Sequence, residues 1–373
     1  MSTAGSASVL FSRLRRAIVG GLVLGGLASS GAALGGQYLI GTYYFPGWTD
    51  HAKGLNFPLP WEPIKKYPER EPLLGWYSDS DGRVLRKQIE WMRSYGIGFV
   101  AFDWYWNGKA SYLDQSVKTF KAVKIKGQMS YSLLWANHFR FPGKMPEYKA
   151  MVDDWIANHF SDPDFLKIDG RPVVFVFAMD AFADAAKTIG VSPRELVDVA
   201  DAMTRAAGFP GIYLVGGTPA LEYWVNGVGP SAGFKALSAY NYHRGYSGTA
   251  ESAKPNAEGY AQFDAAYQQN WKWILQKASL PYIVPMSSGW DSRPWKNGVA
   301  SKHDDSMSSP DQFESHLLAA KKVMDGYPGK TRKMGVICCW NEFGEGSYIE
   351  PTKKDGFSYL EKVRKVFGSG AGK

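Results

Sequence analysis

The sequence predicts a (β/α)8 barrel, an α/β fold of TIM type, and three observations lead to this prediction. Eight short runs of apolar, β-branched or aromatic residues recur along the chain, and helical patterns lie between them. Alternation of strand and helix is typical of a barrel or of a doubly wound sheet. The count of eight and the near-continuous hydrophobicity of the runs favour the barrel, whose parallel strands are buried on both faces.

The eight predicted strands are short and end near turn residues. They are Leu39–Phe45, Gly98–Tyr105, Met129–Ala136, Pro172–Ala178, Ile212–Gly217, Ala236–Tyr242, Tyr282–Gly289 and Met334–Asn341.

The segments between these runs carry apolar residues at helical spacing. In Arg83–Tyr95, for example, Val84, Leu85, Ile89 and Met92 recur near a period of 3.6 residues. Several of the other segments begin near Ser or Asp, which cap helices. The further predicted helices are Asp114–Val123, Tyr148–His159, Ser192–Ala207, Ala261–Ala278, Pro310–Met324 and Gly356–Phe367, and Pro219–Trp224 is a shorter, weaker pattern.

The lengths of the connections add the third observation. Long segments follow three of the strands, namely Pro46–Ser80, His243–Gly259 and Trp290–Ser309, whereas most connections before strands are short. Two longer connections before strands, 159–171 and 325–333, are exceptions. Barrel enzymes build their sites from the loops that follow the strands, so we expect the site on that side.

The first 36 residues have the pattern of a secretory signal. Arg13, Arg15 and Arg16 precede Ala17–Leu34, a glycine-rich apolar stretch without charge. The alternative is an uncleaved membrane anchor, and only in that case do we expect contact with a membrane. We therefore expect a signal segment at 1–36, one catalytic domain at 37–367 and a disordered tail at 368–373, in a secreted or periplasmic protein whose mature chain begins near residue 34.

Composition narrows the function classes. The formal net charge is +8, and three of these charges are the arginines of the first 36 residues. No Lys/Arg run with interleaved aromatics is present, so a nucleic-acid partner is not expected. The two cysteines, Cys338 and Cys339, are adjacent; neighbours on a strand point to opposite faces, so a bridge between them is expected to be strained.

The segment Trp340–Pro351 is the most informative one for function. It follows a buried apolar run and places Glu342 and Glu345 three residues apart, close to two glycines. A pair of carboxyl groups in an apolar setting can split its pKa values, so that one acts as the acid and the other as the base. The alternative is a surface turn whose acids only solubilise it.

Residues at the predicted strand ends form a further pattern. Aromatic rings stack on the C–H faces of sugars, and amide and carboxylate groups bond hydroxyl groups. We therefore expect a site for a neutral, polyhydroxylated ligand, although any one of these residues alone is more readily explained by packing. The candidate substrate-binding residues are Tyr44, Trp48, Asp103, Trp104, Trp106, Asn137, Tyr240, Tyr242, Trp290, Asp291 and Asn341.

No cofactor or metal is expected. The six histidines show no close metal-ligand pair, and whether His138 and His243 meet at the barrel mouth is left open by the sequence. Asp79-Ser80-Asp81 resembles a metal-nucleotide motif but directly precedes a predicted helix, where Asp and Ser cap N-termini.

Taken together, these motifs resemble glycoside hydrolase family 99 and, more closely, the family 99-like proteins labelled WbsX. The resemblance spans nearly all of the chain after the N-terminal segment, in the same order. It rests on Tyr43-Tyr44-Phe45-Pro46-Gly47-Trp48, Gly98-Phe99-Val100-Ala101-Phe102-Asp103-Trp104-Tyr105-Trp106, Leu134-Trp135-Ala136-Asn137, Lys167-Ile168-Asp169-Gly170-Arg171-Pro172-Val173, Gly289-Trp290-Asp291-Ser292-Arg293-Pro294 and the Trp340–Pro351 segment.

The resemblance implies a (β/α)8 barrel and retaining, endo-type cleavage of α-mannosides. It implies that Glu342 assists the 2-hydroxyl group of the sugar as an internal nucleophile. Glu345 is then implied to protonate the leaving oxygen and later to activate water. Family 99 tends to have Trp-His between the two acids, whereas this chain has Phe343-Gly344.

The expected function is thus that of an exported glycoside hydrolase. It would cleave α-linked, mannoside-like bonds inside a polysaccharide or glycan. The alternatives are a glycosyltransferase of polysaccharide biosynthesis and a catalytically silent glycan-binding barrel. The sequence does not define the sugar, the linkage or the oligomeric state.

Overall fold

The computed structural model describes residues 38–49, 60–138, 140–301 and 303–368. The predicted signal segment at 1–36 and residues 369–373 of the predicted tail lie outside the described residues. Among the described helices, none combines the length and the apolar character needed to cross a membrane.

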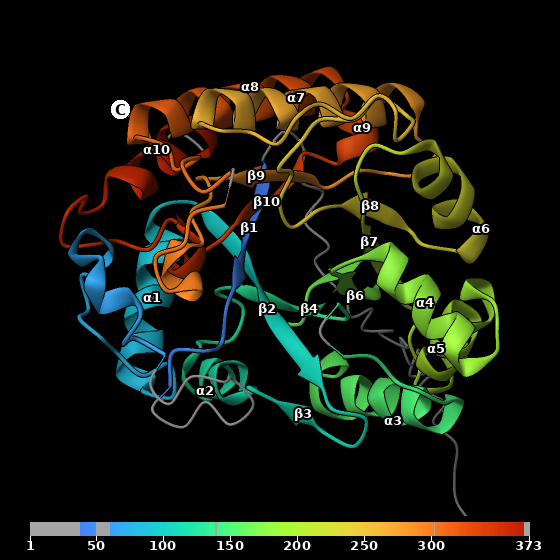
Figure 1. Cartoon of the computed structure of the whole chain (residues 1–373). Coiled ribbons are helices and arrows are strands. Elements are labelled where there is room, and N and C mark those ends of the chain that lie inside the picture. The colour runs from blue at the N-terminus through green and yellow to red at the C-terminus, as the bar shows by residue number, and fades with distance from the viewer. Residues whose placement is uncertain (1–37, 50–59, 139, 302, 369–373) are drawn as a thin grey trace, which may run out of the picture. The chain divides into compact units, whose positions relative to one another are not determined.

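Eight parallel strands form a nearly closed barrel, which confirms the predicted fold (Figure 1). Their order is β8-β7-β6-β4-β2-β1-β10-β9, and a parallel bridge between Leu237 and Tyr282 connects the two ends of the sheet. The strands are β1 (Leu39–Tyr44), β2 (Ile97–Trp106), β4 (Ser130–Trp135), β6 (Arg171–Val176), β7 (Tyr213–Gly217), β8 (Ala236–Ser238), β9 (Val284–Ser287) and β10 (Met334–Cys338). Each overlaps one of the eight predicted runs.

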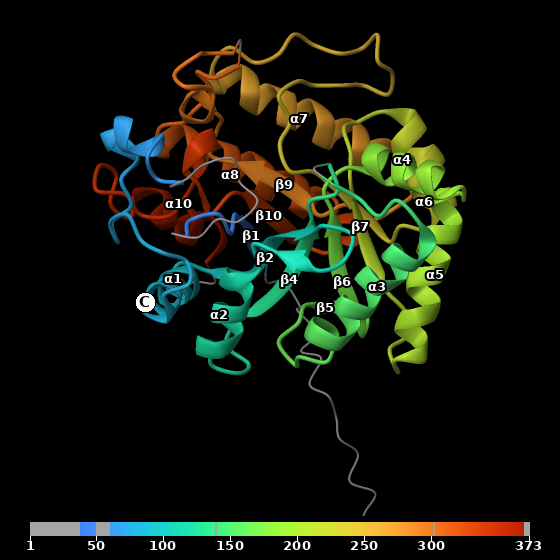
Figure 2. The same ribbon diagram turned by 60° about the horizontal axis from the view of Figure 1, so that its bottom comes forward.

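Helices surround this ring of strands (Figures 1 and 2). They are α1 (Gly82–Ser94), α2 (Gln115–Val123), α3 (Met145–Trp155), α4 (Met179–Ile189), α5 (Pro193–Ala206), α6 (Gly229–Ala232), α7 (Tyr260–Lys277), α8 (Pro310–Gly326), α9 (Pro328–Thr331) and α10 (Ser358–Phe367). Ser192 and Ser309 form capping boxes at α5 and α8. The Asp81 side chain accepts a hydrogen bond from the backbone N–H of Arg83, so the predicted capping role at α1 is confirmed.

Short elements complete the chain. They are β3 (Ser111–Tyr112), β5 (Lys167–Ile168), β11 (Asn341–Glu342), β12 (Ser347–Tyr348), the 3-10 helices Ile64–Lys66, Pro68–Arg70, Arg293–Lys296 and Phe343–Glu345, and the π-helices Ile156–Phe160 and Tyr223–Val228.

One long helix, α4, was not predicted. Its buried face consists of Met179, Phe182, Ala185 and Ala186, and alanines give only a weak hydrophobic period. The weak pattern at Pro219–Trp224 corresponds to the start of the π-helix Tyr223–Val228, which leads into α6.

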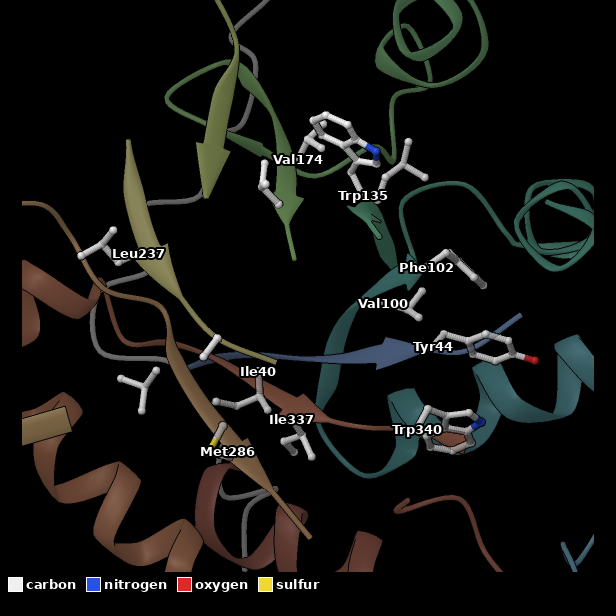
Figure 3. Close-up of a cluster of buried hydrophobic side chains, with 14 of the residues drawn as sticks. Ile40, Tyr44, Val100, Phe102, Trp135, Val174, Leu237, Met286, Ile337 and Trp340 are labelled. Atoms are coloured by element: carbon white, nitrogen blue, oxygen red, sulfur yellow. The ribbon is translucent and has the colours of Figure 1, made fainter. Parts of the chain in front are cut away.

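Alternation along the strands divides the core into two layers. Side chains such as Tyr43, Phe175 and Val336 fill the inside of the barrel. Side chains of the opposite parity, including Tyr44, Phe102, Trp135 and Ile337, pack against the helices (Figure 3). This period of two determines which strand-end residues reach the barrel mouth.

The two cysteines are bonded to each other. The structure joins Cys338 and Cys339 by a disulfide. The strand β10 ends at Cys338, so the alternation of side chains along the strand does not extend to Cys339.

Candidate active site

A cavity of about 840 Å³ lies at the C-terminal ends of the strands. It is lined by residues that end or follow β2, β6, β7, β8, β9 and β10, including residues of the long segments 243–259 and 290–309. This is the side on which the sequence predicted the site.

A tight turn after β10 places both glutamates at this cavity. Glu342 belongs to β11, which pairs antiparallel with β12, and Glu345 ends the 3-10 helix between them. Gly346 has φ +64°, which favours glycine. At Gly344 an added Cβ would lie 1.9 Å from the Trp295 ring, so the turn is closely packed on that side chain.

Asn341 anchors the start of the turn to the segment after β1. Its Nδ2 donates to the carbonyl of Phe45 over 3.0 Å, and its Oδ1 accepts from the N–H of Phe45 over 2.8 Å. Trp48 donates its Nε1–H to the carbonyl of Asn341 over 2.9 Å. Both side chains are fully buried, and their hydrogen bonds fix the start of the turn.

The side chain of Arg70 also stabilises the backbone of the turn. It is buried and forms an ion pair with Asp291. Its Nη1 donates to the carbonyls of Asp291 and Phe343, over 3.0 and 2.8 Å. The N–H of Asp291 donates in turn to the carbonyl of Glu345 over 2.5 Å. The backbone of Phe343–Glu345 is therefore fixed by a buried charged pair.

The Tyr240 hydroxyl connects two carboxyl groups. It lies 3.2 Å from Oδ2 of Asp103 and 3.0 Å from Oε1 of Glu342. A phenol has one proton, so it can donate to only one of the two. If it donates to Glu342, the contact with Asp103 requires a proton on Asp103. If it donates to Asp103 instead, the proton has to be on Glu342, so the two contacts together require one protonated and allow one ionised carboxyl group.

Three neighbouring carboxyl groups of the cavity, those of Asp103, Glu342 and Glu345, have raised pKa values. Burial raises the pKa of Glu342 to about 8, although the hydrogen bond from Tyr240 acts in the opposite direction. Burial, followed by the nearby charges of Glu342 and Asp103, raises the pKa of Glu345 well above its usual range. Burial and the charge of Glu342 do the same to the pKa of Asp103. Of the two glutamates, only Glu342 accepts from Tyr240, so it is the better placed to ionise first while Glu345 keeps its proton.

Another part of the cavity wall is aromatic and basic. The His243 ring lies 4.5 Å from the Trp290 ring and 4.6 Å from the His303 ring, measured between centroids. Arg244 and Asn256 lie beside them on the cavity wall. Burial lowers the pKa of His243 to about 3, and it also lowers the pKa of His303, so both imidazoles are neutral at pH 7.

Six of the candidate site residues line the cavity. They are Glu342, Glu345, Asp103, Tyr240, Tyr242 and Trp290. His138 and His243 also line it, but they pack on different partners: the His138 ring lies 3.8 Å from the Phe177 ring, and the His243 ring lies next to Trp290 and His303.

The other seven candidates do not line it, so the expectation of direct contact with a ligand there is corrected. Asn341, Trp48 and Asp291 support the turn through the hydrogen bonds described above. Asn137 bonds the backbone of Ala178, donating to its carbonyl over 2.8 Å and accepting from its N–H over 3.0 Å. It therefore connects the loops after β4 and β6.

The remaining three, Tyr44, Trp104 and Trp106, lie in the layer between barrel and helices. Tyr44 donates to Gln88 of α1 over 3.1 Å. The rings of Trp104 and Trp106 stack on each other at 5.6 Å. On β2 the parity that brings Asp103 to the cavity turns both tryptophans the other way.

Several cavity residues were not among the candidates. Tyr105 shares the parity of Asp103, so the alternation on β2 was a usable signal for it. Trp295, His303 and Asn256 come from the long loops, whose course the sequence does not determine. Within the described residues, no group of three or more His, Cys, Asp or Glu is placed to hold a metal ion.

The fold and the site together define a class: a (β/α)8 barrel with a cluster of buried carboxyl groups at the C-terminal ends of its strands. The endo-alpha-mannosidase of family GH99 from Bacteroides thetaiotaomicron aligns with a TM-score of 0.61 and 17% identity, over 88% of this chain and 96% of the mannosidase. A solved structure described as a glycoside hydrolase-like protein aligns with a TM-score of 0.64 and 15% identity, over 89% of this chain and 94% of the other.

The family follows from a match to the sequence model described as Glycosyltransferase WbsX, which covers residues 64–363. The chain belongs to this family. It is also 20% identical to a Xanthomonas campestris pv. campestris (strain B100) protein named "Uncharacterized protein WxcX", over 313 residues. The match covers 79% of this chain but only 42% of that relative, and the same shares hold for its counterpart in strain ATCC 33913.

Proposed function

We propose that this protein is a glycoside hydrolase that cleaves α-linked, mannoside-like bonds within a polysaccharide or glycan. The observation that carries the proposal is the carboxyl cluster of the cavity, in which Tyr240 contacts Glu342 and Glu345 lies three residues further on. Hydrolysis of a glycosidic bond requires a proton donor and a second carboxylate at one site. Because a barrel fold hosts many functions, the proposal depends on the site and not on the fold.

The proposed mechanism gives each glutamate one role. Ionised Glu342 accepts the proton of the sugar 2-hydroxyl group, whose oxygen attacks the anomeric carbon. Protonated Glu345 gives its proton to the leaving oxygen as the bond to the anomeric carbon breaks. Glu345, now a carboxylate, takes a proton from water, which opens the anhydro sugar at the anomeric carbon. The 2-oxygen regains its proton from Glu342, and two inversions retain the configuration.

The pKa shifts support this division of roles. A general acid has to be protonated at the working pH, and the pKa of Glu345 is raised well above its usual range by burial and by two nearby carboxyl groups. The base has to ionise first, and Tyr240 donates to Glu342. When the environments of two carboxyl groups push their pKa values apart, the group with the higher pKa is assigned as the acid and the other as the base.

The proposal is tested by incubating the purified protein with a panel of α-linked polysaccharides, α-mannans included. Product sizing and NMR of the first anomer formed are the measurements. We expect oligosaccharides from internal cleavage, with retained configuration. Release of monosaccharides alone would contradict internal cleavage, and an inverted anomer would contradict assistance by the 2-hydroxyl group.

Glycosyl transfer is the second candidate, because the matching family is described as a glycosyltransferase. The same panel, supplied with nucleotide sugars, distinguishes the two. Longer products that form only when a nucleotide sugar is present would favour transfer over hydrolysis. Binding without either reaction would favour a silent glycan-binding barrel.

We also propose that the protein is exported, on the basis of the charged and apolar pattern of residues 1–36. Cell fractionation and N-terminal sequencing of the full-length product test this. A chain found outside the cytoplasm that begins near residue 34 would support cleavage. A membrane-bound chain that still begins at Met1 would contradict it.

A further inference from the structure

The basic part of the cavity wall differs in chemistry from the carboxyl cluster. It is formed by His243, Arg244, Trp290 and His303. Two of these residues begin the long segment 243–259 after β8, and two come from the long segment after β9. The mechanism proposed above uses none of them, so their chemistry requires a separate explanation.

The backbone around Arg244 is held in place. Asn270 of α7, fully buried, donates to the carbonyl of Arg244 over 3.0 Å and accepts from the N–H of Tyr246 over 3.2 Å. The Nε of Arg244 donates to Oδ1 of Asn256 over 2.7 Å. The guanidinium group is thus oriented through Nε, and both terminal nitrogens remain for another partner.

Neighbouring cations are neutralised, whereas Arg244 is not. Arg293 pairs with Asp291 and Asp305, and Lys296 lies 3.9 Å from Asp304. Within the described part of the chain, no carboxylate forms an ion pair with Arg244. Asp304 is already bonded by the backbone and hydroxyl groups of Ser292 and Ser301. The positive charge of Arg244 therefore faces the cavity without a protein counter-ion.

Three polar atoms of the same wall are also without partners. Nδ1 of His243, Nδ1 of His303 and Nε1 of Trp290 are buried and have no hydrogen-bond partner among the described residues. Buried polar groups are normally satisfied, and leaving one unsatisfied is costly. The three atoms are covered by their neighbours, so the group of this wall that remains open to a polar, anionic ligand is the guanidinium of Arg244.

We infer that this wall is a subsite for the carboxylate of a hexuronate residue in the glycan. Arg244 binds the carboxylate through its terminal nitrogens, a planar match that favours carboxylate oxygens. Trp290 supplies an aromatic surface for the sugar ring. The neutral histidines add hydrogen bonds without adding charge. The inference rests on the proposed function and refines it, since the sequence alone indicated a neutral ligand.

The test measures binding separately from cleavage. Trigalacturonate and trimannuronate are compared with the neutral trisaccharides obtained from each by reduction of the carboxyl groups. Isothermal titration calorimetry is performed with the wild type, Arg244→Gln and Arg244→Lys. Arg194→Gln is the matched control, because Arg194 is an exposed arginine of α5 paired with Asp198 and its loss changes the net charge equally.

We expect at least one acidic trisaccharide to bind about 10- to 100-fold more tightly than its neutral counterpart, the range of a charge-assisted hydrogen bond. Arg244→Gln should abolish this difference, and Arg244→Lys should retain only part of it, since an ammonium group lacks the planar fork. Arg194→Gln should preserve it. Thermal melting shows whether each variant is folded.

Two outcomes would overturn the inference. In one, neither acidic trisaccharide binds more tightly than its neutral form to the folded wild type. In the other, Arg244→Gln weakens both forms equally. Neither depends on turnover, so a failure to hydrolyse any glycan would count against the proposed function alone. Tighter binding of sulfated than of carboxylated trisaccharides would also overturn it, because the anion would then not be a carboxylate.

Discussion

The hydroxyl group of Tyr240 lies 3.0 Å from Oε1 of Glu342. Tyr240 follows β8 and Glu342 follows β10, so two separate strands of the barrel bring these groups together. The contact opposes the effect of burial on the pKa of Glu342, because a hydrogen bond donated to a carboxylate stabilises its charged form.

Tyr240→Phe should move the acidic limb of the pH profile of kcat/KM to higher pH. Loss of the donor raises the pKa of Glu342 further, and Glu342 has to be ionised to accept a proton. A charge-assisted hydrogen bond contributes about 1.5–3 kcal/mol, so the limb should move by about one to two pH units. Initial rates at pH 4 to 10 with a cleaved glycan measure this.

Tyr148→Phe is the control for Tyr240→Phe. It also removes one buried phenol hydroxyl, which donates to the carbonyl of Leu196 over 3.0 Å. The acidic limb should stay in place in this variant. A Tyr240→Phe enzyme whose rate falls equally at every pH would indicate that Tyr240 contributes only to packing or binding.

Glu345→Gln and Glu342→Gln should each lower kcat by roughly 10²–10⁴-fold while substrate binding remains. Each change removes one proton-transfer group and keeps the size of the side chain. Steady-state kinetics and calorimetric binding of the same glycan are the measurements. Near-wild-type turnover in either variant would remove that residue from the mechanism.

The strands could be predicted because each is a short apolar run, and the order of such runs defines the barrel. The face on which a side chain lies was harder to predict. Ile97–Trp106 is apolar almost throughout, so composition does not separate Asp103 and Tyr105, which reach the cavity, from Trp104 and Trp106, which do not. The alternation along the strand separates them once Asp103 is known to point inward.

Contacts over long sequence distances could not be predicted at all. Trp48 and Asn341 were both expected to touch a ligand, and they bond each other across 293 positions instead. Asp291 was also expected to touch a ligand, and it pairs instead with Arg70, 221 positions away. An aromatic or polar residue near a strand end therefore serves the site in one of two ways, by lining it or by supporting the residues that do.

Glu350→Gln should make the stability less dependent on pH. Glu350 is buried outside the cavity, where it accepts from Tyr77 over 2.7 Å and from Gln88 over 3.0 Å, and burial raises its pKa to about 8. Between its unfolded pKa, near 4.3, and this value, the folded state binds more protons than the unfolded state. The contribution of Glu350 to the stability is then fully present below about pH 4 and is lost as the pH rises to about 8.

A glutamine stays neutral, so Glu350→Gln should gain stability relative to the wild type as the pH rises from 5 to 9. The maximum gain is a few kcal/mol, at about 1.4 kcal/mol per pKa unit. Urea unfolding at both pH values measures it. A difference between variant and wild type that is the same at pH 5 and pH 9 would mean that Glu350 does not titrate as described.

Arg70→Met should both destabilise the protein and impair catalysis. The buried guanidinium group satisfies the carboxylate of Asp291 and the carbonyls of Asp291 and Phe343. Removing one partner of a buried pair costs about 3–5 kcal/mol, because the remaining groups stay buried. The loss also frees the backbone between Glu342 and Glu345, so kcat should fall in the fraction that remains folded. Urea unfolding and kinetics at low temperature measure the two effects.

Arg293→Met provides the comparison, because Arg293 pairs with the same carboxylate. Its side chain is 37% exposed, whereas that of Arg70 is 1% exposed. It also does not reach the backbone of the turn. Its loss should cost about 1 kcal/mol or less, as for an ion pair open to solvent, and should leave kcat nearly unchanged. Equal losses in the two variants would show that the pairing of Asp291, and not the support of the turn by Arg70, determines the effect.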